Sequence, residues 1–197
     1  MRLPYSLLVA VLVLASGTAS AQITVASSGD WSDPTTWSSG AVPTASDDVV
    51  IADSTVTIDI PDAVANDVTV SGEGWLRTGR SNPESPFGLT VFGDLTIDGP
   101  DAELRPLSNV DDNEVGLGLI YHRLTVHGSI DNSTGGTFDM RRGSTSTTPQ
   151  DASFIDLVFA GDQDATLELG PYDSNTNQLF RTEIAKEGGA TVTMLSD

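Results

Sequence analysis

The sequence predicts an all-β protein, and within that class a right-handed parallel β-helix with a cap at its N-terminal end. Three observations lead to this prediction. Short apolar–Thr–apolar triplets recur along the chain, three of them share a longer pattern that ends in glycine, and no stretch after the N-terminal apolar run keeps helical periodicity beyond a turn or two. An antiparallel β-sandwich, which is also built from short alternating strands, stays open as the alternative.

Each triplet is typical of a short strand with period-two alternation, in which threonine faces outward and the two aliphatic side chains face the core. The triplets lie at 23–25, 56–58, 68–70, 89–91, 95–97, 124–126 and 192–194, and 167–169 repeats the pattern around Glu168. The best helical candidate, residues 180–186, is short and ends near a glycine pair.

The longer pattern reads [LV]-T-V-x-G at 68–72, 89–93 and 124–128, with starts 21 and 35 residues apart. Such spacing is typical of a solenoid whose rungs each repeat one strand and turn. The glycine permits a sharp corner. The longer interval predicts a loop inserted between rungs near 106–121, and insertions of this kind often form a binding face.

The segment from Trp31 to Pro43 supplies the expected cap. It combines Trp31 and Trp37 with turn-forming Pro34 and Pro43, and an uncapped solenoid end would invite aggregation. We therefore expect residues 22–55 to form the cap and the first strands, and 56–197 to form the rungs. Since the chain closes on another triplet, 192–194, without a cap, the expectation is a solenoid truncated at its C-terminal end.

The first residues have the pattern of a secretory signal peptide, 1–21. Arg2 precedes an apolar run at 7–15, and Ala-Ser-Ala at 19–21 is a cleavage site, so the mature chain is expected to begin at Gln22. The apolar run is shorter than the about 20 residues that a membrane-spanning helix needs. A secreted or cell-surface protein with no membrane insertion after cleavage is the prediction; an N-terminal membrane anchor is the alternative.

Charge and cysteine content exclude several classes of function. The chain carries 28 acidic and 9 basic residues, a formal net charge of −19. A surface this acidic repels nucleic acids and anionic membranes. The absence of cysteine excludes disulfides and thiolate metal sites.

The residues from Gly29 to Ile51, followed by T-V-T-I-D and D-V-T-V-S-G, resemble the start of the eight-glycine domain family. They are equally similar to the N-terminal parts of large secreted parallel β-helix surface proteins of Bacteroidetes-type bacteria. The resemblance covers 31–93 well and later segments more loosely. It implies a β-helix and, since some members of the family bind or act on hyaluronan-like glycans, a link to polysaccharide. It carries over no catalytic residue.

No constellation of catalytic residues stands out. Carboxylate pairs are frequent in so acidic a chain, but no spacing singles out two for glycoside hydrolysis, and the nucleophile elbow G-x-S-x-G is absent. His122 and His127 are an odd number of positions apart, which places them on opposite faces of a strand and argues against a shared metal. The prediction is therefore a protein that is not an enzyme.

Two kinds of binding site remain as candidates. Asp111, Asp112 and Glu114 cluster hard oxygen ligands that suit calcium, although EF-hand spacing is absent and a solvated loop is the simpler interpretation. Calcium is thus the single cofactor considered. The aromatic residues Trp75, Phe92 and Tyr121 are candidates for contact with sugar rings, which stack on apolar ring faces.

A glycosylation sequon, Asn132-Ser133-Thr134, is also present, but a turn before Gly135 explains it as well. Together these features predict a secreted or cell-surface, non-enzymatic module with a structural or adhesive role. Its expected partners are polysaccharide or further rungs of the same protein. A glycan-binding module, or the non-catalytic front part of a polysaccharide-degrading enzyme, is the alternative.

Overall fold

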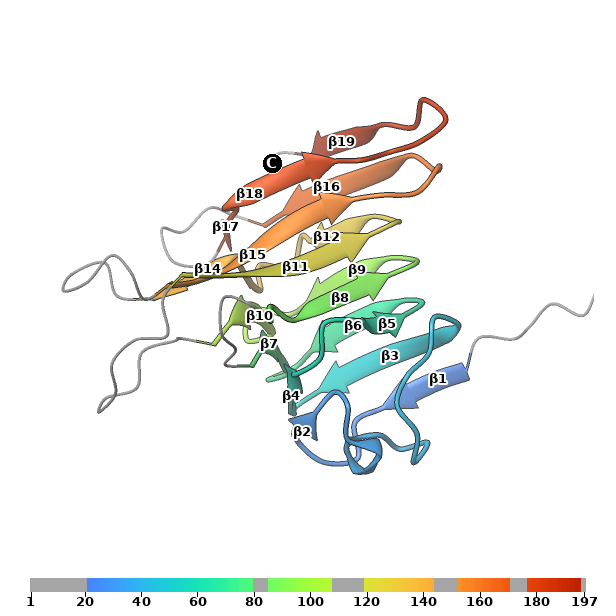
Figure 1. The fold of residues 1–197 in the computed structure, drawn as a ribbon, viewed down its shortest axis with the longest axis vertical. Coiled ribbons are helices and arrows are strands. Elements are labelled where there is room, and N and C mark those ends of the chain that lie inside the picture. The colour runs from blue at the N-terminus through green and yellow to red at the C-terminus, as the bar shows by residue number, and fades with distance from the viewer. Residues whose placement is uncertain (1–20, 80–84, 108–118, 144–151, 171–176, 196–197) are drawn as a thin grey trace, which may run out of the picture.

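A computed structural model describes residues 21–79, 85–107, 119–143, 152–170 and 177–195, and within them the protein is a parallel β-helix (Figure 1). The chain passes from one sheet to a second and a third and then returns, so each circuit adds a rung. Every ladder between the described strands is parallel except the one between β14 and β15. The prediction of a β-helix is confirmed, and the antiparallel sandwich is wrong.

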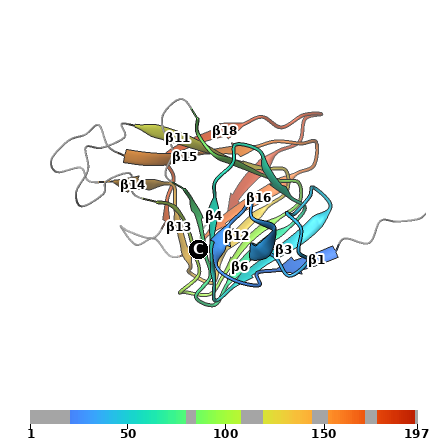
Figure 2. The same ribbon diagram turned by 60° about the horizontal axis from the view of Figure 1, so that its bottom comes forward.

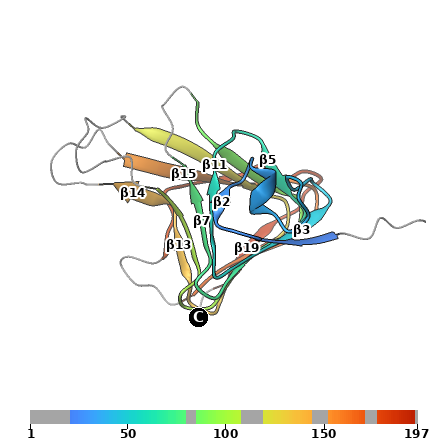
Figure 3. The same cartoon turned by 90° about the horizontal axis from the view of Figure 1, so that it is seen from below.

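The three sheets form the sides of a roughly triangular cross-section (Figure 3). The first sheet consists of β1 (Ala21–Thr24), β3 (Asp47–Ala52), β6 (Val68–Ser71), β9 (Leu95–Asp98), β12 (Ile130–Asn132), β16 (Ala165–Leu169) and β19 (Val192–Leu195). The second consists of β2 (Gly29–Asp30), β4 (Thr55–Ile58), β7 (Trp75–Thr78), β10 (Glu103–Pro106), β13 (Thr137–Asp139) and β17 (Asn177–Gln178). The third consists of β5 (Ala63–Ala65), β8 (Gly88–Val91), β11 (Ile120–Val126), β15 (Ala152–Phe159) and β18 (Arg181–Ile184), with β14 (Arg141–Gly143) antiparallel to the start of β15.

Register stacks the aliphatic side chains into one core. In the first sheet, Val68 lies opposite Leu95, and Leu95 lies opposite Ile130 in the next rung; all three are fully buried. The intervening Thr69 and Thr96 are opposite each other and half-buried on the outer face. The predicted alternation is confirmed, and each fully buried aliphatic side chain contributes about 1.5–3 kcal/mol to the hydrophobic free energy of folding.

Two predictions about particular segments are wrong. The three glycine-ended patterns are not equivalent, because 68–72 belongs to the first sheet whereas 89–93 and 124–128 are register neighbours in the third. The helical candidate 180–186 contains strand β18, which pairs with β15. Pairing with the preceding rung overrides the weak local helical preference there.

The glycine at the end of the pattern makes room for an aspartate of the preceding rung. A Cβ on Gly93 would lie 1.8 Å from Asp67 Oδ1, and a Cβ on Gly128 would lie 2.2 Å from Asp94 Oδ1. These carboxylates need the space because they accept hydrogen bonds from the next rung: Asp67 from the Asp94 N–H at 2.8 Å, and Asp94 from the Ser129 N–H at 2.7 Å. The aspartates thus tie successive rungs together at this corner.

The expected cap closes the N-terminal end of the stack, which Figure 2 brings forward. Trp31 and Trp37 are completely buried, and their rings meet edge to face at 4.9 Å between centroids. The Trp37 indole N–H donates to the Trp31 carbonyl at 2.9 Å, and the Trp31 N–H donates to the Thr57 carbonyl at 2.7 Å. Between the tryptophans, a short 3₁₀ helix, η1 (Pro34–Thr36), is N-capped by the Asp33 carboxylate. The cap is therefore bonded to the first rungs as well as packed against them.

Candidate functional site

Three long connections lead from the second sheet to the third. They join β7 to β8, β10 to β11, and β13 to β15 in three successive rungs. The predicted insertion near 106–121 is one of them, since β10 ends at Pro106 and β11 begins at Ile120. The calcium candidates Asp111, Asp112 and Glu114 lie outside the described residues. Among the residues that are described, no group of three or more His, Asp or Glu side chains is arranged to hold a metal ion.

Three aromatic rings meet on the outer face of the third sheet, just beyond these connections. Tyr121 on β11 lies opposite Phe154 on β15, and Phe180 immediately precedes β18. Their centroids are 5.4 Å (Tyr121–Phe154), 4.1 Å (Phe154–Phe180) and 6.0 Å (Tyr121–Phe180) apart, with planes within 33° of one another. Phe154 is buried, while Tyr121 and Phe180 are 41% and 44% exposed. We call these three residues the aromatic cluster.

A row of charged side chains runs beside the aromatic cluster. Register places Arg123, Asp156 and Arg181 opposite one another on three neighbouring strands. Arg181 forms an ion pair with Asp156, and its guanidinium lies 5.9 Å from the centroid of the Tyr121 ring. The Arg123 Nη2 lies 3.7 Å from Glu183 Oε2. Apolar ring surface thus borders planar hydrogen-bond donors and carboxylate acceptors, a combination that suits a sugar's C–H face and its hydroxyls.

The structure does not bring the three predicted sugar-contact residues together. Trp75 on β7 is half-buried, and the guanidinium groups of Arg77 and Arg105 lie 4.7 and 4.8 Å from its ring centroid, so two cations already contact the indole. Phe92 follows β8 and packs on His127 at 4.9 Å.

Tyr121 is the one predicted residue that belongs to the aromatic cluster. Register pairs Val91 with Val126, which puts Phe92 six positions further along the sheet than Tyr121, a separation of about 20 Å. Phe154 and Phe180 were not predicted. The signal that could have found Phe154 is its place in the apolar, strand-forming stretch 153–159.

His122 and His127 do not share a site, as their spacing predicted. His122 is fully buried on the core side of β11, where its Nδ1 accepts a hydrogen bond from the Phe87 N–H at 3.1 Å and its ring stacks on that of Phe87. Burial lowers the pKa of His122 to about 4. The neutral imidazole is therefore part of the core.

This buried histidine predicts a pH-dependent stability. Between pH 6.5 and 4 the unfolded chain binds a proton that the folded chain does not, so the free energy of unfolding falls as the pH is lowered. From pH 7 to pH 5 the expected loss is roughly 2 kcal/mol, at about 1.4 kcal/mol per pH unit. Urea unfolding at both pH values measures it, and His122→Gln should reduce the loss by that amount. The same pH dependence in both proteins would contradict the prediction.

The sequon asparagine is not available for glycosylation in the folded protein. Asn132 is fully buried, and its Nδ2 donates to the Gly136 carbonyl and to Asn177 Oδ1, each at 2.8 Å. Asn177 in turn donates to the Gly170 carbonyl at 3.2 Å. The pair forms an internal amide ladder between neighbouring rungs.

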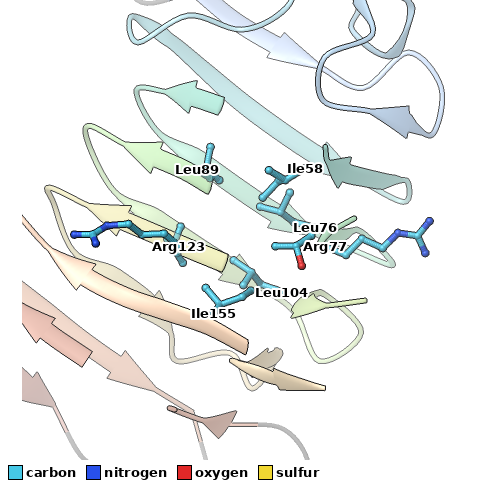
Figure 4. Close-up of a pocket in the computed structure, with 9 residues that line it drawn as sticks. Ile58, Leu76, Arg77, Leu89, Leu104, Arg123 and Ile155 are labelled. Carbon is cyan, nitrogen blue, oxygen red and sulfur yellow. The ribbon is translucent and has the colours of Figure 1, made fainter. Parts of the chain in front are cut away.

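A void inside the helix is a packing gap of the core. It lies between the second and third sheets and is lined mainly by aliphatic side chains, while the side chains of Arg77 and Arg123 point away from it (Figure 4). The aliphatic lining residues are Ile58, Leu76, Leu89, Leu104, Leu124 and Ile155. Thr78 also lines the void, and a single hydroxyl among aliphatic side chains is too little to orient a polar substrate.

The aromatic cluster and its charged row are therefore the surface feature with the clearest chemistry for a ligand.

Within the part of the chain that the structure describes, no helix is long and apolar enough to cross a membrane. Comparison with known proteins found no matching family model, no matching curated protein and no matching solved structure.

Proposed function

We propose that the protein is a secreted or cell-surface, non-enzymatic β-helix module with a structural or adhesive role, and that its aromatic cluster contacts polysaccharide. The observation that carries the proposal is the exposure of Tyr121 and Phe180 beside the row formed by Arg123, Asp156 and Arg181. Two large aromatic side chains left partly in water at one place are costly unless they meet a partner.

The chemistry of the site supports binding rather than catalysis. The Asp156 carboxylate beside the rings is ion-paired with Arg181. The guanidinium and carboxylate groups can donate to and accept from sugar hydroxyls without any change in protonation. The long stack of rungs would hold this surface away from the anchoring point, as a stalk does.

Retention on immobilised polysaccharides tests the proposal with a matched control. We expect the full chain to bind at least one member of a panel of neutral and acidic polysaccharides. Tyr121→Ala and Phe180→Ala should each weaken binding about tenfold, which is about 1.4 kcal/mol. Phe92→Ala should leave binding unchanged, because Phe92 lies outside the aromatic cluster. It is a matched control, since Phe92 is as exposed as Phe180, at 43% against 44%.

Three outcomes would contradict the proposal. Binding to no polysaccharide, or equal losses in Phe92→Ala and Phe180→Ala, would remove the role of the cluster. Release of reducing ends that disappears when a single carboxylate is mutated would instead identify a polysaccharide-degrading enzyme.

A further inference from the structure

The two charged pairs beside the aromatic cluster differ in how closely their members bind each other. Asp156 and Arg181 are in direct contact. Arg123 Nη2 and Glu183 Oε2 are 3.7 Å apart, which is longer than a hydrogen bond. The Arg123 side chain donates from Nε to Thr125 Oγ1 at 3.4 Å, and its terminal nitrogens donate to no other described residue. Arg123 and Glu183 therefore keep hydrogen-bonding capacity for a ligand.

The strand register places this second pair on the outer face, next to the Tyr121 ring. Arg123 lies opposite Asp156, and Glu183 lies opposite Val158, so the pair comes from the two strands that flank β15. Their side chains approach each other across β15. Tyr121 and Arg123 are two positions apart on the same face of β11, a distance of about 7 Å. A sugar ring stacked on Tyr121 would thus have its hydroxyls beside the pair.

The chemistry of the pair favours a hydroxyl over a charged group. A guanidinium only donates hydrogen bonds and a carboxylate only accepts them, so a ligand group that contacts both has to accept and donate. A hydroxyl does both. A carboxylate on the ligand would contact Arg123 but be repelled by Glu183. Asp156 adds a further acceptor, because its Oδ1 is buried and accepts no hydrogen bond from any described residue.

The carboxylates of the site decide this selection more than the net charge of the protein does. At physiological ionic strength, interactions between exposed charges are largely screened beyond about 8 Å. The net charge of −19 therefore acts weakly on a bound sugar, whereas Glu183 and Asp156 act directly. Given the polysaccharide contact proposed above, on which this step rests, we infer that the site selects neutral sugar chains and that Glu183 is the residue that excludes acidic ones.

A matched pair of polymers tests the selection. The neutral polysaccharide that the full chain binds is compared, by titration calorimetry, with the same polymer after oxidation of its primary alcohols to carboxylates. The oxidised polymer should bind at least about fivefold more weakly, the upper range for one exposed charge pair. Glu183→Gln keeps the shape and an acceptor oxygen but removes the charge, so it should reduce this difference to less than about twofold.

Glu168→Gln is the control for net charge. It removes the same single charge on β16 in the first sheet, away from the aromatic cluster, and should keep the difference between the polymers. Circular dichroism checks that both variants keep their β structure.

The possible results separate this inference from the proposed function. Binding of the oxidised polymer as tightly as the neutral one would overturn the selection for neutral chains and leave the polysaccharide contact standing. An unchanged difference in Glu183→Gln, or an equal reduction in Glu168→Gln, would overturn the role of Glu183. Binding of no polysaccharide at all would overturn the proposed function itself and the selection with it.

Discussion

Trp31→Ala is expected to lower the free energy of unfolding by about 4 kcal/mol, the usual range for a large aromatic side chain removed from a core. Trp31 has no exposed surface, meets the edge of the Trp37 ring and covers the first rung. Its removal leaves a cavity at the end of the stack, where only the cap separates the core from water. Equilibrium urea unfolding followed by fluorescence and by circular dichroism measures the loss.

Trp75→Ala provides the control for the tryptophan cap. The Trp75 ring is half-buried on the outer face of β7 and makes its ring contacts with Arg77 and Arg105. Its truncation should therefore cost markedly less, about 1 kcal/mol, in the range of cation–π contacts at a partly exposed site. If both substitutions cost the same, Trp31 would not have the capping role that its burial indicates.

Gly93→Ala is expected to cost about 2–3 kcal/mol, as overpacking in a tight site does. The added Cβ would meet the Asp67 carboxylate, which is held in place by the Asp94 N–H. The nearest backbone atom, the Asn66 carbonyl oxygen, is 3.3 Å away, so the obstacle is a side chain. In an Asp67→Ala background the same glycine substitution should therefore cost much less.

Gly128→Ala should behave differently from Gly93→Ala when each is combined with replacement of the aspartate that the new Cβ would meet. Its Cβ would lie 2.2 Å from Asp94 Oδ1 but also 2.5 Å from the Gly93 carbonyl oxygen, which no side-chain replacement removes. The loss on Gly128→Ala should then persist in an Asp94→Ala background. Double-mutant cycles of urea unfolding give both coupling energies. Equal coupling energies for the Gly93–Asp67 and Gly128–Asp94 pairs would contradict the prediction. They would show that the backbone at this corner shifts to make room for the added Cβ.

The core of the rungs could be predicted from the sequence because period-two alternation is a local property. Val68, Leu89, Leu95 and Leu124 are buried as their triplets indicated. The same alternation occurs in all three sheets, however, so a triplet does not reveal which sheet it joins. The glycine pattern misled for a related reason: Gly72 makes room for Asp53 at a different corner, as Gly93 does for Asp67.

The candidate site could be predicted only in part, since its residues meet across rungs of unequal length. Tyr121 stands out as an aromatic residue beside a long connection. Its neighbours Phe154 and Phe180 come from the following rungs, and their alignment with Tyr121 depends on the lengths of the intervening connections. Those lengths carry no periodic signal, so only the fold places the three rings together.

The corner aspartates give the stack a direction. Asp67 accepts from the rung that follows it, Asp94 accepts from the one after that, and near the far end Asp164 accepts from the Thr191 N–H at 2.8 Å. Each of these three aspartates thus presents an acceptor to a donor that lies later in the chain. A polypeptide emerging N-terminus first would complete its cap first, and the segments that begin at Asp94, Ser129 and Thr191 would each find an acceptor already in place. Assembly of this fold can then proceed in step with the emergence of the chain.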